Sequence, residues 1–147
     1  MIDAAREHDR ANVIAVEEVP MERIASYGVV GVGKTKGKAF AITEMVEKPP
    51  REQAPSNLII TGRYILQPEI FALLETQEGG AGGEIQITDA MIRLAKQQLF
   101  YGLKFDGRSF DCGSKVGFLA ANIAYALKRG DIAPALRKEI RELLGKR

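Results

Sequence analysis

The order of strand-length and helical segments constrains the fold of this chain more than any other feature. Residues 12–17 (Asn-Val-Ile-Ala-Val-Glu) form an apolar run of strand length, and a charged helical segment, residues 2–11, leads directly into it. A helix that leads into a buried strand suggests that the chain begins inside a βαβ unit. Further strands are expected at residues 28–32, 39–46, 58–66 and 99–105, with a short extended piece at 110–111. This order predicts an α/β fold with a mixed sheet.

Helices are expected between and after these strands. They are predicted at residues 68–75, 89–98 and 116–129 and from 132 onward, with a short turn or helical piece at 20–26. We expect Thr88 to cap the second of these helices, Gly130 to close the third and Asp131 to cap the last. The last helix is amphipathic, because its apolar side chains recur on one face.

The loops are marked by glycine and proline. Residues 33–38 have the small, charged composition of a hairpin loop. Their Gly-Lys-Thr triplet lacks the earlier glycine that a phosphate-binding loop requires, so we interpret it as part of that loop. Residues 49–57 contain three prolines and are predicted to be irregular, and residues 76–83 form a glycine-rich connection. Gly62 interrupts a strand, which indicates a close backbone approach.

Composition excludes several classes of protein. A chain of 147 residues with 46% hydrophobic and 27% charged residues is expected to form one globular domain. No apolar run approaches the roughly 18 residues of a membrane span, and the N-terminus has no signal core, so a cytoplasmic protein is expected. A net charge of +2 argues against a nucleic-acid surface. The single cysteine, Cys112, and the single histidine, His8, exclude an internal disulfide and Cys- or His-rich metal sites.

Two short motifs carry candidate chemistry. In Glu47-Lys48-Pro49, a carboxylate that can accept two hydroxyl hydrogen bonds stands beside an ammonium that can neutralise a phosphate. In Asp111-Cys112-Gly113, a carboxylate precedes a turn and a helix, and it could offer a hard oxygen to Mg²⁺. Taken by themselves, the first motif is better explained as an exposed ion pair before a proline loop, and Asp111 as a helix-cap residue.

Six motifs in order support a functional interpretation. They are 26–30 (Ser-Tyr-Gly-Val-Val), 46–49 (Val-Glu-Lys-Pro), 54–58 (Ala-Pro-Ser-Asn-Leu), 62–64 (Gly-Arg-Tyr), 84–90 (Glu-Ile-Gln-Ile-Thr-Asp-Ala) and 110–115 (Phe-Asp-Cys-Gly-Ser-Lys). Taken together, they closely resemble the bacterial UTP–glucose-1-phosphate uridylyltransferases, which are sugar-phosphate nucleotidyltransferases. The resemblance covers nearly the whole chain.

The resemblance implies a Rossmann-like nucleotide-diphospho-sugar transferase fold. Family members are about twice as long, and their first half binds the nucleoside triphosphate. Residues 1–147 would accordingly be a single C-terminal, sugar-binding portion, with 114–147 as a helical assembly segment and the N-terminal nucleotide-binding half absent. The family transfers a uridylyl group from UTP to glucose 1-phosphate, which gives UDP-glucose and pyrophosphate.

The resemblance also implies roles for individual residues. Glu47 would bind two glucose hydroxyls, and Lys48 would neutralise the sugar phosphate and the charge of the transition state. Gly28 and Gly62 would let the backbone approach the sugar, although either could be a plain turn or bulge glycine. Asp111 would be one Mg²⁺ ligand.

Two other functions remain open. The chain could be a half-length module that binds a sugar phosphate or nucleotide sugar without turnover, or it could belong to a sister thymidylyl- or adenylyltransferase. Whether it is part of a uridylyltransferase or a binding module, we expect the chain to be inactive alone. An incomplete sheet would expose an edge and an apolar helix face, so a homo-oligomer, dimer or tetramer, is expected.

Overall fold

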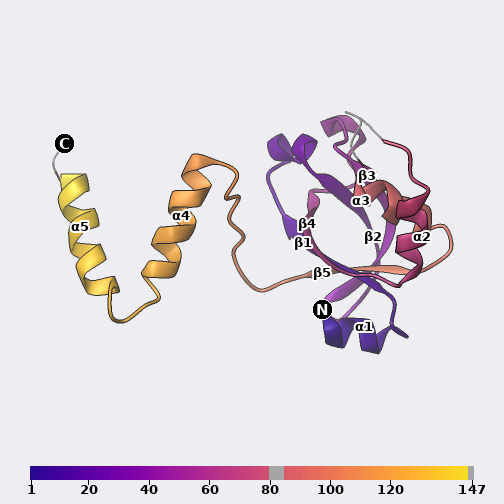
Figure 1. The fold of residues 1–147 in the computed structure, drawn as a ribbon, viewed down its shortest axis with the longest axis horizontal. Helices are drawn as coiled ribbons and strands as arrows, with labels where there is room; N and C mark the ends of the chain where they lie inside the picture. The colour runs from indigo at the N-terminus through magenta and orange to yellow at the C-terminus, as the bar shows by residue number, and fades with distance from the viewer. Residues whose placement is uncertain (80–84, 146–147) are drawn as a thin grey trace. The chain divides into compact units, whose positions relative to one another are not determined.

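The computed structural model describes residues 1–79 and 85–145. The chain divides into two compact units, Met1–Phe105 and Asp106–Arg147. Figure 1 labels the α-helices and strands of each unit. Residues 80–83 of the predicted glycine-rich loop, and Glu84 of the motif that follows, lie outside the described residues.

Five strands form the sheet of the first unit in the described part of the chain. They are β1 (Asn12–Glu18), β2 (Gly28–Lys36), β3 (Ala39–Glu47), β4 (Leu58–Ile65) and β5 (Phe100–Lys104). The strand order is β1-β4-β2-β3-β5, and a parallel β1–β5 pair closes the sheet into a small barrel. Every other pairing is antiparallel. The predicted mixed α/β class is confirmed, but the expected open edge was wrong for these strands, because closure gives each one two neighbours.

Helices cover this sheet and complete its core. They are α1 (Ile2–Glu7), the 3₁₀ segments η1 (Met21–Ser26) and η2 (Arg51–Gln53), α2 (Glu69–Glu75) and α3 (Ile87–Leu94). The main core joins side chains of all five strands to α2 and α3, which lie next to each other in Figure 1. Val13 instead packs against Ala4 and Ala5 of α1. Because β1 is buried on both faces, its sequence is a continuous apolar run without alternation.

The second unit contains α4 (Lys115–Ala126) and α5 (Ala133–Gly145). Ser114 caps α4, since its hydroxyl accepts a hydrogen bond of 3.0 Å from the N–H of Gly117. No residue of α5 is fully buried, and Leu143 and Leu144 are 71% and 74% exposed. Among the described residues, no helix combines the length and apolar character needed to span a bilayer.

Several predicted boundaries were wrong for local reasons. The first helix stops at Glu7, because Asp9 and Arg10 take the left-handed conformation, with φ of 52° and 58°. The predicted loop at 33–38 is mostly strand: β2 continues to Lys36, and Gly37, with φ of 63°, makes the turn. Alternating charged and small residues suit a solvated strand as well as a loop, so composition alone misplaced this boundary.

The predicted caps were also displaced. α3 begins at Ile87 with Gln86 in the cap position, and Thr88 is buried inside its first turn. α5 begins at Ala133, and the carboxylate of Asp131 accepts a hydrogen bond of 3.1 Å from Nε of Arg129. This guanidinium lowers the pKa of Asp131. The short extended piece expected at 110–111 is not a strand.

Candidate functional site

Gly28 and Glu47 face each other across the first rung of the β2–β3 ladder. Gly28 is the first residue of β2 and Glu47 is the last of β3. The pairing extends one step further, because the N–H of Lys48 donates to the C=O of Tyr27 at 3.0 Å. The backbone of the Glu-Lys pair is therefore fixed by the sheet rather than by a free loop.

The carboxylate of Glu47 lies where three further elements meet. A Cβ atom added at Gly28 would be 3.0 Å from Oε2 of Glu47, 3.0 Å from Cδ1 of Ile60 in β4 and 3.5 Å from Cγ2 of Thr88 in α3. Only a glycine leaves this space beside the carboxylate open. Burial raises the pKa of Tyr64, and the negative charge of Glu47 raises it further, so the phenol is also near this carboxylate.

Lys48 has an uncommon backbone conformation. Its φ is 46°, in the left-handed region, and it precedes Pro49, whose ring is fully buried. A non-glycine residue in this region costs free energy of the order of 1 kcal/mol, and such strain often occurs at functional sites. The lysine side chain therefore projects from a turn whose backbone is fixed on one side by the hydrogen bond of its N–H to Tyr27 and on the other by the buried ring of Pro49.

The two charged groups of the pair are not tightly bound to each other. Nζ of Lys48 is 4.0 Å from Oε1 of Glu47, and the lysine side chain is 57% exposed. An exposed ion pair at this distance contributes little to stability. The ammonium keeps hydrogen-bond donors for a ligand, and the carboxylate keeps acceptor positions, so together they can bind a molecule with adjacent hydroxyls and a phosphate.

Gly62 lies at a bulge in β4. Ile60 pairs with Val16 and Tyr64 pairs with Ile14, so residues 61–63 face Ala15 alone. Gly62 takes a φ of 72°, and a Cβ atom there would meet nothing within 4 Å. The bulge by itself explains the glycine, and the open space also fits the predicted approach of a ligand. Its place in a binding site stays a prediction.

Asp111 belongs to the second unit and forms a local turn. Its Oδ1 accepts a hydrogen bond of 3.0 Å from the N–H of Gly113, and its C=O accepts one of 3.0 Å from the hydroxyl of Ser114. A Cβ atom at Gly117 would be 2.0 Å from that carbonyl oxygen, so glycine is required for this approach. The helix cap that sequence left open for Asp111 is instead supplied by Ser114.

The described residues do not supply a complete magnesium site. Among them there is no group of three or more His, Cys, Asp and Glu side chains placed to hold a metal ion. Asp111 can offer one hard oxygen, whereas Mg²⁺ prefers six ligands. A magnesium ion at Asp111 would need oxygens from substrate phosphates or from residues other than these.

Of the predicted site residues, Gly28, Glu47 and Lys48 lie together in the first unit. Sequence reasoning missed Thr88 and Ile60, which together with Glu47 surround the Cβ position at Gly28. Thr88 lies within the 84–90 motif, which could have indicated a place in the site, but its sequence position predicted a helix cap instead. Nothing in the sequence indicated Ile60, because its proximity to Gly28 depends on the order of strands in the sheet.

Residues 1–128 match the protein family described as nucleotidyl transferase. The chain belongs to this family. It is 45% identical over 132 residues to the UTP–glucose-1-phosphate uridylyltransferase of Staphylococcus epidermidis, an alignment that covers 90% of this chain and 46% of that enzyme. The corresponding Bacillus subtilis enzyme is 39% identical over 136 residues, which cover 92% and 47% of the two chains.

Solved structures agree with this assignment. A UTP-bound UGPase from Acinetobacter baumannii matches with a TM-score of 0.83 and 36% identity, over 97% of this chain and 49% of that one. A UDP-glucose pyrophosphorylase complexed with UDP-glucose matches with a TM-score of 0.79 and 40% identity, over 86% and 48%. The chain thus spans about half the length of the relatives that it matches.

Proposed function

We propose that this chain forms the sugar-phosphate-binding part of a UTP–glucose-1-phosphate uridylyltransferase, which makes UDP-glucose and pyrophosphate. The observation that carries the proposal is the Gly28–Glu47 rung, with the strained Lys48 directly beyond it. The rung leaves room beside a carboxylate, and the turn places an ammonium next to it. This combination suits a ligand that carries both neighbouring hydroxyls and a phosphate.

In this proposal each residue has a defined part. Glu47 accepts hydrogen bonds from two adjacent hydroxyls of the glucose ring. Lys48 neutralises the phosphate attached to the sugar and the negative charge that develops as that phosphate attacks the α-phosphate of UTP. Gly28 and Gly62 allow the backbone to approach the sugar. Asp111 contributes one ligand to Mg²⁺, the ion that would neutralise phosphate charge.

The substrates UTP, glucose 1-phosphate and UDP-glucose are part of the proposal. Relatives described as bound to UTP and UDP-glucose support it, but those proteins are about twice as long as this chain. We expect the 147 residues alone to bind the sugar ligand and to release no pyrophosphate.

Titration calorimetry of the full chain with UDP-glucose, paired with a pyrophosphate-release assay, tests the proposal. Gly28→Ala should weaken binding about tenfold or more, because its Cβ would press on the Glu47 carboxylate at 3.0 Å. Gly31→Ala is the matched control on the same strand, since its Cβ would meet Thr43 and Glu44 instead. It should lower stability and leave the affinity of the folded chain unchanged.

Each outcome decides a different point. Equal effects of the two alanine variants, or no binding by the wild-type chain, would contradict the proposed sugar site. Robust turnover that depends on UTP and glucose 1-phosphate would show that the chain is active alone and would overturn that expectation. Tight binding without turnover, even when the rest of a uridylyltransferase is supplied as a second polypeptide, would favour a binding module.

A further inference from the structure

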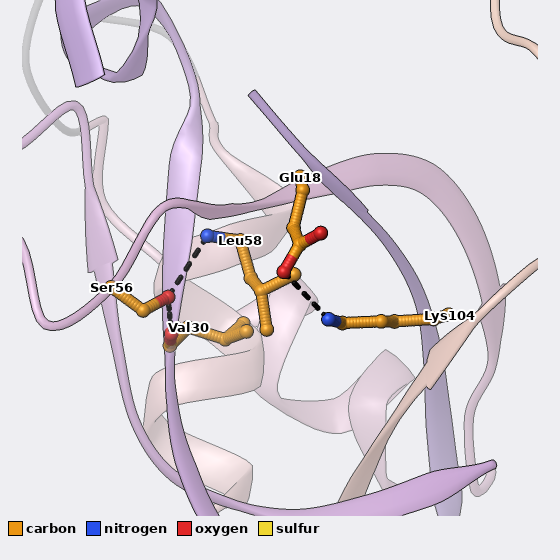
Figure 2. Close-up of polar contacts among 5 residues, drawn as sticks. All are labelled: Glu18, Val30, Ser56, Leu58 and Lys104. Atoms are coloured by element: carbon orange, nitrogen blue, oxygen red, sulfur yellow. Dashed lines mark hydrogen bonds and ion pairs between the residues drawn. The ribbon is translucent and has the colours of Figure 1, made fainter. Parts of the chain in front are cut away.

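Ser56 bridges two strands through its hydroxyl group. Its Oγ donates a hydrogen bond of 2.6 Å to the C=O of Val30 in β2 and accepts one of 2.9 Å from the N–H of Leu58 at the start of β4 (Figure 2). Both partners are backbone atoms, so the bridge fixes the strands themselves. Ser56 belongs to the 54–58 motif, which the proposed function does not use.

The bridge lies between the two neighbouring strands that share the fewest paired residues. β2 pairs with β3 from Gly28 to Lys36, but it pairs with β4 only at Val29 and Ile59. A single paired position restrains the separation and angle of two strands only weakly. The Ser56 hydroxyl adds a second connection next to that position, and it takes the place of a backbone ladder bond.

The separation of β2 and β4 sets the width of the space beside Glu47. Gly28 is two residues before Val30 on β2, and Ile60 is two residues after Leu58 on β4. Cδ1 of Ile60 lies 3.0 Å from the Cβ position at Gly28, next to the Glu47 carboxylate. If β4 moves away from β2, Ile60 moves away from Gly28, and the close packing around the Gly28–Glu47 pair is lost.

We propose that Ser56 is a positioning residue for the site at Gly28 and Glu47. It does not touch the ligand; it holds β2 and β4 at the separation that gives the site its shape. This inference rests on the proposed function for the identity of the ligand, but not for the role of the hydroxyl in holding the strands.

The test compares Ser56→Ala and Ser56→Thr variants of the 147-residue chain with wild type. Threonine keeps the hydroxyl, so it should restore what alanine removes. Lys104→Met is the control, because it removes another cross-strand polar contact: Nζ of Lys104 is 2.7 Å from Oε1 of Glu18, which joins β5 to β1 (Figure 2). Amide hydrogen exchange and UDP-glucose affinity are measured for all four proteins.

In Ser56→Ala, exchange at Val29, Ile59 and Lys48 should accelerate about tenfold, whereas exchange at Ile14 in β1 stays near wild type. UDP-glucose affinity should fall about fivefold to tenfold. Ser56→Thr should recover both values, and Lys104→Met should change neither.

Two results would overturn the inference. A uniform acceleration of exchange over the whole sheet would make Ser56 a general stabilising residue. A local acceleration with unchanged affinity would separate the hydroxyl from the site. If wild type fails to bind UDP-glucose, the proposed function of the chain fails, and the exchange pattern alone still decides whether Ser56 holds β2 against β4.

Discussion

At the scale of single residues, Lys48 combines a strained backbone with the binding role proposed for its side chain. Its left-handed backbone is enforced by the bond from its N–H to Tyr27 and by the buried ring of Pro49. A glycine would adopt this conformation without strain. The proposed binding role of the ammonium would explain why a charged, exposed side chain stands at such a position, where it adds little to folding.

Replacement of Lys48 should separate these two effects. Lys48→Gly relieves the backbone strain and should raise the free energy of unfolding by about 0.5 to 1 kcal/mol relative to Lys48→Ala. Both variants lose the ammonium and should lose UDP-glucose affinity equally. Urea denaturation and calorimetric titration measure the two quantities. Equal stability of the two variants would show that the turn is not strained.

The proximity of Glu47 and Tyr64 gives a prediction about pH. Burial and then the Glu47 charge raise the pKa of Tyr64, so the folded protein favours the protonated phenol. The associated stability is complete below the unfolded pKa of about 10 and is lost as the pH rises through the higher folded value. Glu47→Gln should lower the pKa of Tyr64, because it removes one of the two effects that raise this pKa, while the opposing charge of Arg63 stays.

Phenolate absorbance during an alkaline titration measures this shift, and Tyr64→Phe identifies the relevant phenol among the four tyrosines. Glu44→Gln is the control, since Glu44 is an exposed carboxylate on the same strand. An identical titration curve for Glu47→Gln and wild type would mean that the carboxylate does not face Tyr64.

At the scale of elements, the bulge in β4 and the β2–β3 turn form a natural comparison. Gly62 and Gly37 have similar positive φ values, 72° and 63°, and neither has a neighbour within 4 Å of a Cβ position. Alanine at either position should destabilise the chain by about 1 kcal/mol through backbone strain alone.

Binding should distinguish the two glycines. If the backbone at Gly62 approaches the sugar, Gly62→Ala weakens UDP-glucose binding, and Gly37→Ala, in the distant hairpin turn, does not. Denaturation and titration of both variants give the comparison. Equal affinities would assign Gly62 to the bulge alone.

Elements were predictable from sequence where a local pattern determined them. The buried run of β1 was correctly placed at residues 12–17, and its strand extends only to Glu18. The end of β2 was not, since residues 33–36 are solvated and their polarity does not distinguish a strand from a loop. Thr88 was misassigned because a threonine suits both a cap position and the first turn of a helix. In the structure it lies buried in the first turn of α3, and Gln86 occupies the cap position.

The candidate site was only partly predictable for a related reason. Glu47 and Lys48 are adjacent in sequence, and the motif that contains them indicated a site directly. Ile60 and the Ser56 bridge become neighbours of that site through the order of strands, which one sequence does not determine. Barrel closure was likewise not predicted, because it depends on the parallel pairing of β1 with β5, in which Asn12 pairs with Phe100 far along the chain.

At the scale of the whole molecule, the two helices of the second unit bear on whether the chain associates with copies of itself. The apolar side chains Val116, Leu143 and Leu144 are each more than 70% exposed. Large apolar side chains grouped on amphipathic helices favour contact with another apolar surface. The closed sheet offers no free strand edge in its described residues, so the predicted oligomer depends on these helices rather than on strand pairing.

We expect the 147-residue chain to associate as a dimer or tetramer in a concentration-dependent way. Leu143→Glu combined with Leu144→Glu should shift it toward monomer, since each charge would have to be desolvated at an apolar contact. Lys138→Gln is the control on the same helix: it removes the Lys138–Glu142 ion pair of 3.8 Å and leaves the apolar side chains intact. Light scattering across a dilution series measures the mass. A wild-type monomer at every concentration would contradict the expectation, and an unchanged oligomer in the double variant would place the interface elsewhere on the chain.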